Sequence, residues 1–225
     1  MNRKQLTTKY TSPQFMPILV SEVTRMSMGN YCVAGWDMQN QRMVRPLQLA
    51  RTNWKLGTDR SLFRVGHLIN CIPTDLHNTV YPHANEDLIL STSPTLLETF
   101  DEPATYNLLL PTSFRSIREI FGSPLIDGKY IPDNTNCRSL GGVRASSDRM
   151  NFLKDRFGKF RLEFRDVDNV VYWLPITCDT LLETFSSSGE NEELYFGVPE
   201  ANEWLRANLP GTEIITHLTQ YTCTH

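Results

Sequence analysis

The chain lacks several features that would place it in a common functional class. It has no apolar run near the roughly 18 residues that a membrane-spanning helix needs, so no transmembrane segment is predicted. No two cysteines have the spacing of zinc ligands, and we therefore expect no metal site. The pair Gly141-Gly142 is not followed by Gly-Lys-Ser/Thr, which excludes a P-loop there. We predict no cofactor.

Cysteine is scarce, and its arrangement predicts the redox state. The sequence has an odd number, five, with no Cys-x-x-Cys pair: Cys32, Cys71, Cys137, Cys178 and Cys223. No apolar signal segment stands at the N-terminus. Reduced thiols in a cytoplasmic protein are the expectation.

Proline and glycine are present in moderate numbers and are scattered along the chain. There are 13 Pro and 12 Gly, and 40% of the residues are apolar, which is enough for a sizeable core. Turn-forming residues scattered in this way separate many short secondary-structure elements, which favours a β-rich architecture. The sequence thus predicts a mostly β fold with a few short helices.

One six-residue string, Thr-Leu-Leu-Glu-Thr-Phe, occurs twice, at Thr95–Phe100 and Thr180–Phe185. Each copy follows a β-patterned stretch and a helix-start signal, Ser-Pro or Cys-Asp, and each predicts an apolar helical turn. The repeat indicates two related halves, each a small β-rich unit followed by a short helical piece. The alternative is two unrelated amphipathic turns of the same composition.

The pattern in the first half predicts a meander, the usual opening of a small barrel. Its three strands are Ile18–Thr24, Tyr31–Asp37 and Met43–Leu47. In the first turn, Gly29-Asn30 is expected to supply the positive-φ positions. Two further strands are predicted at Leu68–Pro73 and Asp87–Ser91.

The second half shows the clearest pattern of the chain. Residues 159–165 alternate between apolar and charged, and 170–176 return as the partner strand. Other elements are predicted as follows: a helix at Thr112–Phe121 with Ser113 or Thr112 as cap, a strand at Ser139–Ser146, a helix at Val198–Asn208, and a strand at Glu213–Leu218. The predicted layout is a flexible arm (1–15), a first unit (16–110), a helix and linker (111–136), and a second unit with an acidic tail (137–225).

Several segments resemble one known family. These are Ile18–Met26, Tyr31–Gly35, Val44-Arg45-Pro46 and Tyr81–Leu88 in the first half, and Arg138–Arg144 with the hairpin Phe160–Thr177 in the second. Together they are similar to the dual OB-containing domain family and cover most of residues 16–185. The resemblance implies two OB-like barrels packed in tandem, in bacterial proteins often linked to defence or conflict systems, and a role in handling nucleic acid. It implies no catalytic residues.

The small net charge of −3 hides two basic segments. Residues 138–165 carry eight bases against three acids, 42–64 carry six bases against one acid, and the tail from Asp166 is acidic. OB-like barrels bind single-stranded nucleic acid. Their basic side chains contact the phosphates, and their aromatic rings stack on the bases. The candidate nucleic-acid-binding residues are Arg25, Tyr31, Trp36, Arg45, Arg144, Arg149, Lys159, Arg161 and Arg165.

The sequence contains two other candidate sites. Arg45 and Arg144 each end an apolar strand, so they could bind a small anion, or they could bond backbone carbonyls where the barrels join. His83 and Glu86 belong to the main acid–base cluster and are weak catalytic candidates, although both also fit a turn.

These observations predict a non-enzymatic module that binds single-stranded or structured RNA or DNA, within a bacterial complex. The basic residues would contact the backbone, and Trp36 or Tyr31 would stack on bases. The alternatives are a protein-interaction subunit that docks an effector, and a small hydrolase or nucleotide-sensing protein.

Overall fold

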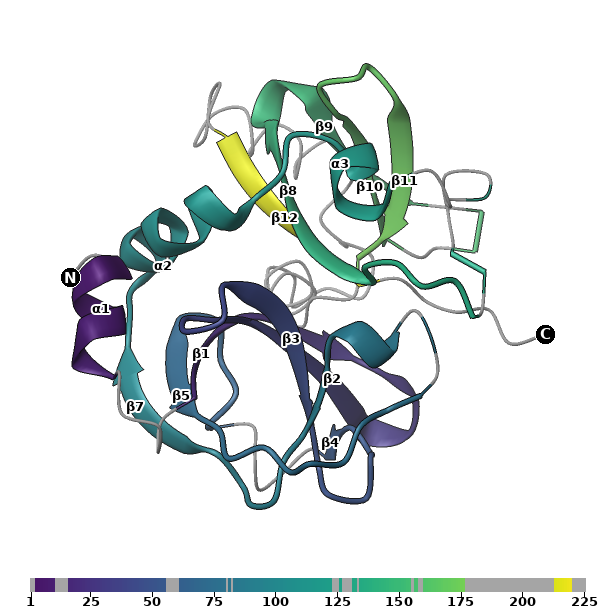
Figure 1. Ribbon diagram of the computed structural model, residues 1–225. Coiled ribbons are helices and arrows are strands. Elements are labelled where there is room, and N and C mark those ends of the chain that lie inside the picture. The colour runs from purple at the N-terminus through teal and green to yellow at the C-terminus, as the bar shows by residue number, and fades with distance from the viewer. Residues whose placement is uncertain are drawn as a thin grey trace, which may run out of the picture.

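The computed structural model describes residues 3–10, 16–55, 61–79, 81, 83–122, 126, 131–132, 134–154, 156–157, 160–176 and 213–219. The fold is mostly β, as the sequence predicts, and Figure 1 shows two β-rich units one above the other. The helices are α1 (Arg3–Lys9), α2 (Glu102–Leu109) and α3 (Ile117–Phe121). The strands are β1 (Pro17–Arg25), β2 (Asn30–Asp37), β3 (Arg42–Leu47), β4 (Trp54–Lys55), β5 (His67–Asn70), β6 (Asp87–Ile89), β7 (Thr95–Thr99), β8 (Leu140–Ser146), β9 (Met150–Lys154), β10 (Phe160–Arg165), β11 (Val171–Pro175) and β12 (Glu213–Thr219).

The predicted meander is confirmed in the first unit. Strands β1, β2 and β3 pair antiparallel in chain order, and the sheet path runs β6-β3-β2-β1-β5-β7. β4 pairs with β2 beside this path. An isolated bridge between Pro73 and Leu90 links the segment after β5 to the end of β6. No ladder joins β6 to β7 among the described strands, so the sheet is not closed along this path.

The first turn differs from the prediction in one position. Positive φ falls on Met28 (56°) and Gly29 (71°), whereas Asn30 is already the first residue of β2. The Asn30 carbonyl accepts the Met26 N–H at 2.8 Å, and Asn30 pairs with Lys55 of β4. These pairings hold Asn30 extended, so the reversal takes place before it.

The prediction for the first copy of the repeat is wrong. Thr95–Thr99 is strand β7, which pairs antiparallel with β5, and not a helical turn. The helix begins later, at Glu102, where the Asp101 carboxylate accepts the Ala104 N–H at 2.9 Å. The edge of β5 pairs with this segment along a ladder that contains one register shift, and the helix begins only after Asp101 caps it. The second copy lies outside the described residues, so the duplication stays a prediction.

Where the sequence predicts a flexible arm, the structure has helix α1. Leu6 is 1% exposed and Tyr10 is 8% exposed, and both pack with Trp36 and Leu68. The Tyr10 hydroxyl donates to Glu98 Oε1 of β7 at 2.8 Å, and Lys9 forms an ion pair with the same carboxylate. Burial of two apolar side chains thus orders a segment that shows no periodic pattern by itself.

In the second unit, the predicted hairpin is confirmed as β10 and β11, and the strand predicted at the C-terminal end is confirmed as β12. β9, which the sequence analysis missed, pairs with the other edge of β10. β12 pairs with β8. The helix predicted at Val198–Asn208 lies outside the described residues.

Helix α3 is shorter than predicted and is capped by another residue. It begins at Ile117, and the Ser116 hydroxyl accepts the Glu119 N–H at 3.2 Å. Ser113 is extended, with φ −82° and ψ 150°, after a 3-10 turn at Leu110–Thr112. α3 ends at Phe121 with Gly122 as its C-cap, as predicted, and its apolar side packs in the core of the second unit.

The two units meet at the start of β8. Leu140 is 1% exposed and belongs to a first-unit cluster that includes Leu19, Met38 and Leu109. The next residue, Gly141, contacts Ile120 of the second-unit core. β8 thus joins the two cores.

A glycine is needed at position 141 because α3 approaches β8 closely. A Cβ at this position would lie 2.4 Å from Ile120 Cγ2, and Ile120 is itself buried. The register of β8 with β12 shows no shift at Gly141, so it marks a close approach and not a bulge.

We therefore expect Gly141→Ala to lower the free energy of unfolding by about 1–3 kcal/mol, the usual cost of overpacking a core. Urea unfolding measures it. In an Ile120→Ala background the same change should cost less, because the clashing methyl group is gone. Equal costs in the two backgrounds would contradict the proposed clash.

Candidate functional site

Alternation along β10 and β11 separates an inner from an outer face of the three-stranded sheet β9–β10–β11. The inner face contributes Leu162, Phe164 and Tyr172 to the second-unit core. Phe164 and Tyr172 stack with ring centroids 5.4 Å apart. Since directly paired residues lie on the same side of an antiparallel sheet, the other register positions form the outer face. We name these residues the outer face, together with Arg149 immediately before β9: Asn151, Leu153, Arg161, Glu163, Arg165, Val171, Trp173 and Pro175.

Trp173 stands midway along β11, an edge strand of this sheet, and is 62% exposed. It pairs with Glu163 on β10, which in turn pairs with Asn151 on β9. Trp173 is not among the nucleic-acid-binding residues predicted from the sequence. The signal was present, because once Phe160, Leu162 and Phe164 are assigned to the core, antiparallel pairing sends Trp173 to the opposite side.

Two guanidinium groups of β10 flank this indole. Arg161 and Arg165 lie two residues before and after Glu163, so each is diagonal to Trp173 across the strand pair. Diagonal neighbours in an antiparallel sheet are about 7–8 Å apart, within reach of long side chains. Arg165 is exposed and Arg161 is half-buried. An aromatic surface with a cation on either side is the result.

Next to Trp173 the outer face contains an open pocket of about 160 Å³. It is lined by Asp148, Arg149, Asn151, Glu163, Phe164, Arg165 and Val171. Asn151 Nδ2 donates to Glu163 Oε1 at 3.1 Å, and Arg149 Nη1 donates to the Asp166 carbonyl at 3.2 Å. Both contacts restrict side chains that line the pocket.

The turn after β10 supports this arrangement. Asp166 is 1% exposed, and its Oδ1 accepts the N–H groups of Asp168 at 3.0 Å and Val170 at 3.2 Å. Asn169 takes the positive φ of the turn, 61°. The carboxylate thus fixes the reversal that brings Val171 and Trp173 back beside β10.

The predicted residues divide between the two units. Arg149, Arg161 and Arg165 come together on the outer face. Arg144 is half-buried on β8, opposite Ile215, and Arg25 is exposed at the end of β1. Lys159 lies outside the described residues.

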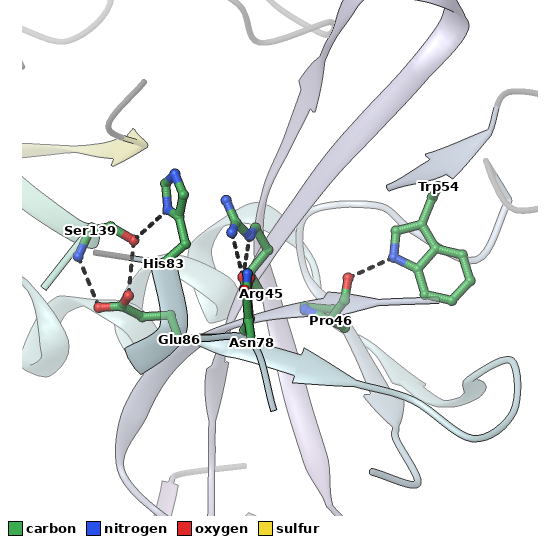
Figure 2. Close-up of polar contacts among 8 residues, drawn as sticks. Arg45, Pro46, Trp54, Asn78, His83, Glu86 and Ser139 are labelled. Carbon is green, nitrogen blue, oxygen red and sulfur yellow. Dashed lines mark hydrogen bonds and ion pairs between the residues drawn. The ribbon is translucent and has the colours of Figure 1, made fainter. Parts of the chain in front are cut away.

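The aromatic candidates of the first unit are in its core. Tyr31 is 5% exposed and pairs with Trp54 on β4, while Trp36 is 8% exposed and packs with Leu6 of α1. Neither ring offers an open face for stacking on a base. Trp54 is also buried, with its Nε1–H donated to the Pro46 carbonyl at 2.8 Å (Figure 2).

Arg45 is held in a largely buried ion pair. Its Nε donates to Asp87 Oδ1 at 2.6 Å, and Asn78 Nδ2 donates to the other carboxylate oxygen at 2.5 Å. The exposed fraction of the side chain is 13% for Arg45 and 0% for Asp87. The guanidinium thus meets a carboxylate within the first unit, whereas the structural alternative predicted from the sequence had it bonding backbone carbonyls where the barrels join.

His83 and Glu86 form a polar junction between the units with Ser139, as Figure 2 shows. Glu86 accepts the Ser139 N–H and hydroxyl, both at 2.9 Å, and His83 Nδ1 lies 3.1 Å from Ser139 Oγ. Ser139 is 1% exposed and Glu86 is 5% exposed. Serine stands between histidine and carboxylate, whereas a nucleophilic triad places histidine in the middle. The geometry is that of a buried connection between units.

Burial raises the pKa of the Glu86 carboxyl above its usual value, although hydrogen bonds from Ser139 oppose the shift. A carboxyl whose folded-state pKa is raised favours the folded state most below its unfolded pKa and loses that contribution as pH rises through the folded value. In the wild-type protein, the free energy of unfolding should therefore fall as pH rises above about 4.5. We expect this fall to be absent in Glu86→Gln. Urea unfolding of both proteins between pH 4 and 7 measures it. Parallel pH profiles would contradict the assignment.

Neither a metal site nor a membrane span is found in the part of the chain that the structure describes. No group of three His, Cys, Asp or Glu side chains is placed to hold a metal ion there. Likewise, none of the described helices has the length and apolar character to cross a bilayer.

Comparisons with models of known protein families, with curated proteins and with solved structures give no match. Function must therefore be argued from the site.

Proposed function

We propose that the outer face binds single-stranded nucleic acid, with Trp173 stacked on a base and Arg161 and Arg165 on the flanking phosphates. The observation that carries this proposal is the 62% exposed indole between two diagonal guanidinium groups. Single exposed apolar side chains are ordinary on protein surfaces. An exposed Trp on a regular sheet, with a cation on either side, is the arrangement by which proteins bind single-stranded nucleic acid.

The energetics favour an aromatic and cationic site of this size. Stacking of one base on an aromatic ring contributes about 1–3 kcal/mol, and every base has a π-face, so the contact tolerates any sequence. Arg149 adds a third cation at the edge of the pocket. Phosphate contacts supply affinity that falls with salt. We infer a non-enzymatic binding module.

The resemblance to the dual OB-containing domain family is part of the same proposal. An OB fold is a partly open five-stranded barrel that binds strands on its sheet and loops. The meander of the first unit and the Pro73–Leu90 bridge support an OB-like first barrel. The outer face would be the binding surface of the second barrel. A place in a bacterial defence complex remains an expectation of the resemblance.

Fluorescence anisotropy with labelled single-stranded oligonucleotides over a salt series tests the proposal. Two phosphate contacts, by Arg161 and Arg165, predict that log K falls with log salt concentration with a slope of about −1.4 for a single strand. Replacing Arg161 and Arg165 together with alanine should remove most of this slope. The matched control replaces the exposed Arg51 and Arg118, which lie away from the outer face.

Two results would overturn the proposal. One is the absence of salt-sensitive binding at micromolar protein. The other is a double variant at Arg161 and Arg165 that binds as tightly as the control, which would favour the protein-interaction alternative.

A further inference from the structure

We propose that the pocket beside Trp173 holds a guanine base, so that the outer face prefers strands with guanine next to the stacked base. This inference rests on the proposed function. Glu163 both pairs with Trp173 and lines the pocket, which places the pocket one step across the sheet from the indole. A base in the pocket and a base on Trp173 would then be neighbours in one strand.

The pocket lining combines acceptors and donors of opposite charge. Asp148 and Glu163 supply carboxylates, and Arg149 and Arg165 supply guanidinium groups. A pocket for a phosphate would present cations without facing carboxylates, because carboxylates repel an anion. A neutral ligand with both donor and acceptor edges matches this lining better than an anion does.

Among the bases, guanine has the complementary pattern. Its Watson–Crick edge carries two adjacent donors, N1–H and N2–H₂, which fit the two oxygens of one carboxylate. Its O6 and N7 are acceptors that fit a guanidinium in a bidentate pair. Adenine and cytosine place a ring acceptor beside the amino group, and uracil has one N–H between two carbonyls, so each would leave a carboxylate oxygen facing an acceptor.

Two polar side chains of the pocket, one carboxylate and one guanidinium, are held in place before any ligand arrives. The Asn151 amide holds Glu163, and the Asp166 carbonyl holds Arg149. Val171, which is 41% exposed, supplies apolar surface for the face of a ring. Groups that are already positioned lose little rotamer freedom on binding, which favours selectivity.

The test measures the affinity of the whole protein for four labelled strands by fluorescence anisotropy. Each is a thymidine tract with guanine, adenine, cytosine or thymine at its centre, and a uridine series repeats the comparison in RNA. The strand with guanine should bind roughly tenfold tighter than the others, since a good bidentate pair discriminates by about this factor or more. Glu163→Gln should bring the four affinities to within about twofold of each other. Glu102→Gln, an exposed change on α2, should keep the preference for guanine.

Each outcome of this test either supports or overturns the guanine pocket. Equal affinity of the wild-type protein for all four strands, or preference for another base, overturns the guanine pocket and leaves the proposed function standing. A guanine preference that survives in Glu163→Gln overturns the assignment to this pocket. If none of the strands binds, both the pocket and the proposed function fail.

Discussion

Replacing Asp87 with alanine is expected to lower the free energy of unfolding by about 3–5 kcal/mol, which is the usual cost of breaking a buried ion pair from one side. The Asp87 side chain is 0% exposed and accepts hydrogen bonds from Arg45 and Asn78. Its removal leaves the Arg45 guanidinium buried without its counter-charge. A domain of ordinary stability, about 5–15 kcal/mol, would lose a large share of it.

Urea unfolding at neutral pH measures this change. Asp87→Asn should cost less than Asp87→Ala, because the amide keeps an acceptor for Arg45. Asp75→Ala, an exposed change in the loop between β5 and β6, serves as the matched control and should stay within about 0.5 kcal/mol. A loss below about 1 kcal/mol for Asp87→Ala would mean that the pair does not stabilise the fold, and Arg45 would again be a candidate ligand-binding residue.

Trp173→Ala is expected to weaken binding of single-stranded oligonucleotides by roughly 5- to 150-fold, the equivalent of about 1–3 kcal/mol of lost stacking. The free energy of unfolding should change little, because the indole is mostly exposed and contributes little to the core. Trp173→Phe keeps an aromatic face and should retain much of the affinity.

Anisotropy titration at fixed salt measures the Trp173 effect. Leu96→Ala provides the control, because Leu96 is 48% exposed on β7 of the other unit. A change of less than twofold for Trp173→Ala, with normal unfolding, would remove the indole from the binding surface. The salt slope should be the same in Trp173→Ala as in the wild-type protein, because stacking displaces no counterions.

Local patterns predicted the parts of the fold that depend on neighbouring residues. The strict alternation of residues 159–165 fixed both a strand and its inner face, and the short turns between β1, β2 and β3 specified a meander. The segment that begins at Thr95 shows where prediction from local patterns fails. It has helix-compatible composition, yet it forms β7, because a distant edge of β5 was available to pair with it.

The candidate aromatic residues could not be assigned correctly from the sequence for a related reason. β2 is buried along nearly its whole length, since Val33 packs into one cluster of the first unit and Trp36 into another. Alternation gives the two faces of a strand but not whether either is open to solvent. Trp36 is covered partly by α1, which comes from a segment without any periodic signal. Trp173, on a sheet with one open face, was within reach of the same reasoning.

The place of Leu140 has a consequence for how the molecule melts. Its side chain lies among the apolar residues of the first unit, while the next residue of β8 contacts Ile120 of the second. Unfolding of the first unit would expose the Leu140 side chain to water, and unfolding of the second would leave the Glu86 carboxyl without its hydrogen bonds from Ser139. The unfolding of the two halves is therefore thermodynamically coupled, and heating in a calorimeter should give one endotherm. Either half expressed alone should have a lower free energy of unfolding than the whole protein.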